Sequence, residues 1–167
     1  MGERIEASGS LAPVKMPARL LNALQEHARE THPEECCGLL LGPALGAHQD
    51  FRRCRNEMTR LHEQDPIGYP RDGRQAFHMN ETDYLRVLNE TEQRGWCVTA
   101  VYHSHADAAA YFSELDQSFA KQPGFPFPEA EHVVISVVEG LVKEAAIFRR
   151  TDEVPGFRGR LLVSEAP

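Results

Sequence analysis

Residues 101–116 read VYHSHADAAAYFSELD and join the end of a strand to the start of a helix. The run that leads into them, from residue 96, is apolar and rich in β-branched and aromatic residues, which is typical of a buried strand. Side chains alternate between the two faces of a strand, so His103 and His105 project to one face and Ser104 to the other. Two imidazoles on one face can bind a single divalent metal ion.

A carboxylate follows these histidines at a useful distance. Asp116 lies in the first turn of a helix expected at residues 114–121, and it can return an oxygen ligand to the same ion. Three protein ligands and a fourth position for water suit zinc, and manganese or ferrous iron accept the same donors. Ser113 and Asp116 also match an acidic capping box, which explains both residues without a metal. The spacing alone leaves both interpretations open.

Composition and charge narrow the class of protein. The chain has 167 residues, of which 41% are hydrophobic and 26% charged, and this predicts one globular domain. We expect the domain at residues 14–167, after a flexible tail, or at most a short edge strand, at residues 1–13. A net charge of −7 disfavours nucleic-acid binding and polybasic membrane attachment. No apolar run approaches a membrane span and no signal-peptide core is present, so a cytoplasmic location is expected.

The four cysteines are expected to be buried free thiols. Their density is too low for a disulfide-stapled secreted domain, and no CxxC spacing indicates a structural zinc site. Cys36 and Cys37 are adjacent within an apolar strand, so they should lie on opposite faces of the sheet.

The order of predicted elements indicates an α/β fold of the mixed α+β kind, with a central mixed sheet flanked by helices. Longer helices are expected at residues 17–30 and 80–94, with Asn80 as the N-cap of the second and Gly95 ending it. Its apolar face is expected to include Leu85. The strands are expected at residues 34–42, 50–55, 76–79, 96–105, 132–138, 141–149 and 158–163. Residues 56–75 are polar, and a long irregular loop is expected there.

A hydrolytic metal site also needs a proton acceptor and a hydrogen-bond donor for the oxyanion. Glu34 and Glu35 open the strand at residues 34–42, where a carboxylate can point into a site or simply mark a solvated strand entrance. Glu35 is the candidate base and Ser113 the candidate donor.

The spacing of these residues carries a family resemblance. Seven residues separate His105 from Ser113, and two separate Ser113 from Asp116. Upstream, residues 33–42 read PEECCGLLLG. The whole pattern resembles the JAMM (JAB1/MPN/Mov34) metalloprotease family, in which a strand glutamate precedes HxH, seven residues, serine, two residues and aspartate. The chain resembles its small bacterial members most, and register against Gly38 selects Glu35 rather than Glu34.

The resemblance implies a cytidine-deaminase-like JAB/MPN fold that binds one Zn²⁺ through His103, His105, Asp116 and a water. It implies that Glu35 is the general base and that Ser113 stabilises the oxyanion. It also implies hydrolysis of a peptide or isopeptide bond at the C-terminal tail of a ubiquitin-like or sulfur-carrier protein. Two alternatives stand beside it: the same chemistry on small peptides or amino-acid amides, and a metal-free binding module. A homodimer is compatible with the apolar residues on the helices.

The sequence departs from the family pattern in the loop between the ligands. The family commonly has proline after the second histidine and before the serine, and here Ala106 and Phe112 occupy those places. This loop is therefore expected to be shaped differently. Asp107 and Tyr111 are candidate substrate contacts or exposed side chains. Asp107 is discounted as a ligand because it lies too close to His105 along an extended segment.

Overall fold

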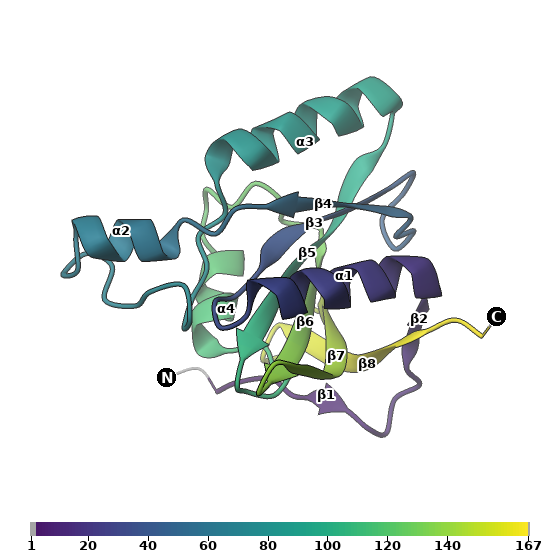
Figure 1. The fold of residues 1–167 in the computed structure, drawn as a ribbon. Coiled ribbons are helices and arrows are strands. Elements are labelled where there is room, and N and C mark those ends of the chain that lie inside the picture. The colour runs from purple at the N-terminus through teal and green to yellow at the C-terminus, as the bar shows by residue number, and fades with distance from the viewer. Residues whose placement is uncertain (1–2, 167) are drawn as a thin grey trace.

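The computed structural model describes residues 3–166, and within them the chain forms one eight-stranded mixed sheet (Figure 1). The strand order is β1-β8-β7-β6-β5-β3-β4, and β2 also pairs with β8. The pairs β5–β6, β1–β8 and β2–β8 are parallel, and the remaining pairs are antiparallel. The strands are β1 (Ala7–Ser8), β2 (Val14–Met16), β3 (Cys37–Gly42), β4 (Asp50–Cys54), β5 (Cys97–Ala106), β6 (Glu131–Val138), β7 (Leu141–Arg150) and β8 (Phe157–Ser164).

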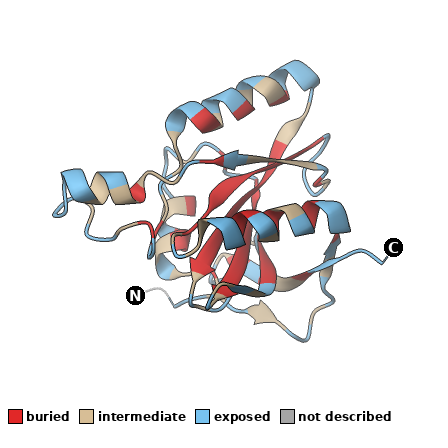
Figure 2. Ribbon diagram, in the orientation of Figure 1, coloured by how far each residue is buried: buried red, intermediate tan, exposed pale blue. Residues whose placement is uncertain are grey.

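Helices cover both faces of this sheet, which confirms the predicted architecture. α1 (Ala18–Thr31) packs on one face, while α3 (Glu81–Arg94) and α4 (Glu114–Ala120) lie on the other. α2 (Met58–Gln64) projects sideways from the body of the molecule (Figure 1). Buried residues concentrate in the strands, and the outer faces of the helices are exposed (Figure 2).

The core is divided by the sheet as the strand pattern predicts. Cys36 packs with Leu40 and Tyr102 beneath α1, whereas Cys37 packs with Leu39 on the opposite face. All four cysteines are free thiols; three of them are buried and Cys97 is half-buried. The prediction of free thiols is therefore confirmed.

The ends of α3 agree with the sequence, but its buried face differs. The Asn80 side chain accepts a hydrogen bond from the Asp83 amide, and Gly95 adopts a left-handed conformation with φ of 67°. Leu85, expected on the apolar face, is 50% exposed, and Val87 and Thr91 are buried instead. A helix at the rim of a sheet buries a narrow stripe, which leaves its remaining apolar side chains in solvent.

Two predictions for residues 56–79 are wrong. The segment expected to be irregular contains α2, and the strand expected at residues 76–79 is reduced to a single bridge between Asn56 and Met79. The Asn56 side chain explains the second difference. Its amide donates to the carbonyls of Glu35 and Ala76, and its oxygen accepts from the His78 amide, so side-chain hydrogen bonds replace a strand ladder.

The N-terminal segment forms an edge strand rather than a loose tail. β1 pairs with β8, and Ile5 exchanges two backbone hydrogen bonds with Phe112 at 2.8 and 2.9 Å. Residues 1, 2 and 167 lie outside the described residues. Among residues 3–166, no helix is long and apolar enough to cross a membrane.

Candidate metal centre and active site

The pairing of β3 with β5 sets the position of the candidate site. Cys37 pairs with His103 in this antiparallel ladder, and the next backbone contact joins Ser104 to Cys36. Ser104 points to the α1 face, where its hydroxyl accepts from the Cys36 amide at 2.8 Å. Because side chains alternate, Glu35 projects to the same face as His103 and His105. The prediction that Ser104 lies on the opposite face of the sheet from the two histidines is therefore correct, and so is the prediction that Cys36 and Cys37 lie on opposite faces.

Three predicted ligands meet at one point. The Nε2 atoms of His103 and His105 lie 3.3 Å apart, and each lies 3.3 Å from Oδ2 of Asp116. All three residues are at least nine-tenths buried. Two imidazole nitrogens and one carboxylate oxygen in this arrangement could hold a metal ion.

The two rings are held in orientations that suit metal binding. Nδ1 of His105 lies 2.9 Å from the carbonyl oxygen of Ala109, so this nitrogen carries the proton and donates it. In this tautomer Nε2 is the ring nitrogen that would offer its lone pair to a metal ion. His103 stacks against Phe77 with a centroid separation of 4.6 Å, which fixes its plane.

Asp116 serves as a helix cap and as a member of this cluster at once. Its Oδ2 accepts from the Ser113 amide, and Ser113 Oγ accepts from the Asp116 amide, both at 3.0 Å. The capping box is therefore present, and it fixes the carboxylate that faces the histidines. Burial alone raises the pKa of Asp116, but the charges and hydrogen bonds of His103 and His105 outweigh it and hold this pKa well below its usual range.

Glu35 is the second buried acid of the site. It is only 6% exposed, and its amide donates to the carbonyl of Gly73 at 2.6 Å. Burial raises the pKa of Glu35 to about 9, the negative charge of Asp116 adds to the rise, and the positive charge of Arg71 opposes it. A buried carboxyl beside a donor cluster, with a strongly raised pKa, has the properties of a group that carries protons.

Comparison with known proteins assigns the family. A family model described as prokaryotic homologs of the JAB domain matches residues 17–151. The chain belongs to the prokaryotic JAB-domain family. This JAB domain is 29% identical to proteins named CysO-cysteine peptidase from Mycobacterium tuberculosis and Mycobacterium bovis, over 86% of this chain and 87% of theirs.

Solved structures agree on the fold of the JAB domain. A solution structure from Desulfitobacterium hafniense matches with a TM-score of 0.64 and 18% identity, covering 92% of this chain and 94% of the other. A protein from Salinibacter ruber matches with a TM-score of 0.60 and 23% identity, covering 92% and 93%.

A cavity of about 360 Å³ opens beside the donor cluster of the JAB domain. It is lined by Glu35, Arg71, Arg74, Gln75, His105, Ala106, Ala108, Tyr111, Ser113 and Asp116. Tyr111 thus borders the cavity, with its ring 4.8 Å from that of His105. Asp107 does not line it. Instead, its carboxylate accepts from the Glu139 amide at 2.8 Å and lies 3.5 Å from Nε2 of His32, which anchors the loop.

The departure from the family pattern at Phe112 has a structural consequence. Phe112 is fully buried, stacks on Phe148, and donates its amide hydrogen to Ile5. Proline has no amide hydrogen and could not make that bond. The N-terminal segment is therefore tied to the loop that carries the site, and Arg4 lies 4.6 Å above the ring of Tyr111.

Sequence reasoning missed two cavity residues, Arg71 and Arg74. They belong to the polar segment expected as a loop, which offers no periodicity to orient side chains. The unusual length of that segment was the available signal, since long loops are often functional.

Proposed function

We propose that this chain is a zinc-dependent peptidase that hydrolyses a bond at the C-terminal tail of a ubiquitin-like or sulfur-carrier protein. The observation that carries the proposal is the donor triangle of His103, His105 and Asp116, with three sides of 3.3 Å. Tetrahedral zinc with bonds of about 2.0–2.1 Å requires ligands about 3.3–3.4 Å apart. The triangle therefore fits one face of such a tetrahedron.

The bound ion would supply one chemical property. Zinc lowers the pKa of water from about 15.7 to about 7, which provides a nucleophile near neutral pH. The protein must then remove a proton, stabilise negative charge on the substrate and protonate the leaving amine.

Glu35 and Ser113 are suited to these tasks. Glu35 accepts the proton of the attacking water and passes it to the leaving nitrogen as the C–N bond breaks. A bound dication nearby would favour the ionised carboxylate that accepts the proton, and burial of the carboxyl favours its protonated form between the two transfers. Ser113 Oγ already accepts from the Asp116 amide, so its own hydrogen is available to donate to the oxyanion.

The similarity to the CysO-cysteine peptidases supports the proposed substrate class. We propose a carrier protein whose C-terminal tail enters the cavity beside Glu35. The same chemistry on small peptides or amino-acid amides is the second candidate, because a cavity of about 360 Å³ admits them equally well.

The test is cleavage of a CysO-cysteine conjugate, followed by mass spectrometry, with chelator-treated protein before and after addition of zinc. We expect hydrolysis only after zinc is restored, and far slower cleavage of a short peptide with the same tail. Equal rates on both substrates would favour the second candidate. Full activity in the chelated protein would contradict the proposal, and no stoichiometric zinc in elemental analysis would favour a binding module.

A further inference from the structure

Two arginines line the cavity without an ionic partner. Arg71 and Arg74 are exposed, and neither forms a salt bridge within residues 3–166. The charge of Arg71 acts on Glu35, where it opposes the rise in pKa, so this guanidinium lies within electrostatic range of the proposed base. Unpaired guanidinium groups beside a reaction site are suited to bind an anionic part of a substrate.

The turn that carries both arginines is held in place by specific contacts. Between them, Gly73 is buried; its amide donates to Thr59 Oγ1 at 2.9 Å and its carbonyl accepts from the Glu35 amide. The Thr59 hydroxyl in turn donates to Glu34 at 3.0 Å. A Cβ at position 73 would lie 2.8 Å from both Thr59 Oγ1 and Glu34 Oε1, so a larger residue would have to displace these two side chains. The turn that carries the arginines is thus hydrogen-bonded to the backbone of Glu35 through Gly73.

The two acidic residues that line the cavity are not available to pair with these arginines. Its charged lining residues are Glu35, Arg71, Arg74 and Asp116. The Asp116 carboxylate is engaged by the two histidines and the helix cap, and Glu35 is assigned to proton transfer. Two positive charges therefore remain for the substrate, in a chain whose net charge is −7.

We propose that Arg71 and Arg74 bind the free α-carboxylate of the substrate's C-terminal residue, so that the enzyme releases one terminal amino acid. This inference rests on the proposed function and narrows it to a peptide bond. An isopeptide bond to an internal lysine has no free carboxylate beside the leaving amine, and the arginines would lack a partner. The reaction remains hydrolysis: water adds oxygen to the carbonyl carbon, the C–N bond breaks, and the nitrogen leaves protonated.

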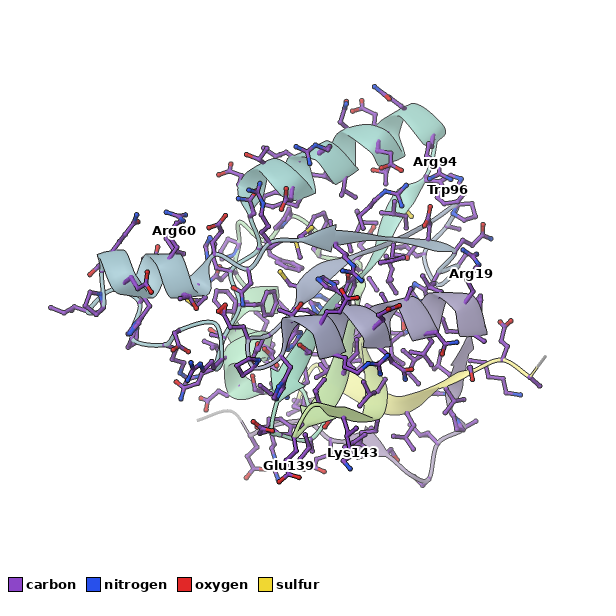
Figure 3. All side chains as sticks on the ribbon, in the orientation of Figure 1. Arg19, Arg60, Arg94, Trp96, Glu139 and Lys143 are labelled. Carbon is purple, nitrogen blue, oxygen red and sulfur yellow. The ribbon has the colours of Figure 1, made fainter. Side chains whose placement is uncertain are left out.

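The test uses zinc-reconstituted full-length protein and two CysO-cysteine conjugates, one with a free C-terminal carboxylate and one with a carboxamide. For the wild type, kcat/KM should be about 10- to 100-fold lower on the amide, the range of a charge-assisted hydrogen bond. In the double variant Arg71→Gln and Arg74→Gln, the acid-to-amide ratio of kcat/KM should fall to about one. An effect of the lost Arg71 charge on Glu35 would change both rates alike and leave this ratio unaffected. Arg60→Gln, on α2 and paired with Glu57 outside the cavity, should keep the wild-type ratio (Figure 3).

A wild-type kcat/KM that is about the same on the acid and on the amide would overturn the inference. Equal losses on both substrates in the double variant would also overturn it, since the arginines would then contact the carrier rather than its terminus. Calorimetric binding of a short peptide with the tail of the conjugate, and of its C-terminal amide, to the Glu35→Gln protein provides a readout without turnover. Preferential binding of the acid, lost in the arginine variants, supports the inference, whereas equal affinity refutes it. If the protein binds the acid more tightly than the amide but the wild type hydrolyses neither conjugate, the proposed function is wrong and the carboxylate-binding role of the arginines stands.

Discussion

Replacement of Glu35 by glutamine is expected to stabilise the metal-free protein, and more at pH 7 than at pH 5. Burial raises the pKa of this carboxyl from its usual 4.5 to about 9. An acid with a raised folded-state pKa contributes stability that is fully present below pH 4.5 and is lost as the pH rises toward 9. Glutamine has no proton to release, so this loss is absent from the variant.

The magnitude follows from the two pKa values. At pH 7 the unfolded chain has titrated about 2.5 pH units past its pKa while the folded chain still holds the proton. At about 1.36 kcal/mol per unit, the wild type has lost about 3 kcal/mol through this residue at pH 7, and less than about 1 kcal/mol at pH 5. The other titratable groups are common to wild type and Glu35→Gln, so the difference between their free energies of unfolding reports on Glu35.

The assay is urea denaturation of chelator-treated wild type and Glu35→Gln at both pH values. Glu34→Gln is the matched control, because Glu34 accepts a hydrogen bond from Thr59 and its replacement should bring no gain in stability at either pH. The reasoning would be refuted if the free energies of unfolding of Glu35→Gln and wild type differed by the same amount at pH 5 and at pH 7.

Three further substitutions separate the roles of neighbouring residues. Ser113→Ala should keep stoichiometric zinc, lower kcat about 10²- to 10³-fold and cost about 1 kcal/mol of stability through the lost cap; unchanged kcat would exclude it as an oxyanion donor. Asp116→Ala should lose stoichiometric zinc in elemental analysis and also lower the melting temperature of the metal-free protein, and retained zinc would contradict its role as a ligand. Tyr102→Phe removes the partner of His27 Nδ1, 2.8 Å away in the core, and should cost about 1–3 kcal/mol in denaturation with zinc content unchanged.

The long strands of the sheet, and the side-chain directions along them, were predictable because they depend on local periodicity. Alternation along β5 is sufficient to place His103 and His105 together and Ser104 opposite them, as the structure confirms. The capping box was predictable too, but only as an alternative to a metal ligand. Sequence spacing does not show that one carboxylate oxygen of Asp116 accepts a hydrogen bond in the cap and also lies against His105.

The parts that were missed depend on tertiary contacts. α2 has seven residues, of which only Met58 is buried, so it shows no amphipathic stripe. Arg71 and Arg74 reach the cavity because Gly73 is bonded to Thr59 and Glu35, contacts that no local pattern encodes. The sequence left the N-terminal segment open between a tail and a short edge strand, because the strand depends on its distant partners β8 and Phe112.

The most direct test of the central claim is the zinc content and kcat/KM of Glu35→Gln, measured on one preparation with the CysO-cysteine conjugate. The three ligands are untouched in this variant, so we expect one zinc per chain, as in the wild type. Without the proton acceptor, we expect kcat/KM to fall at least about 10²-fold, the lower range for general acid–base catalysis. Wild-type turnover by the zinc-loaded variant would contradict the account.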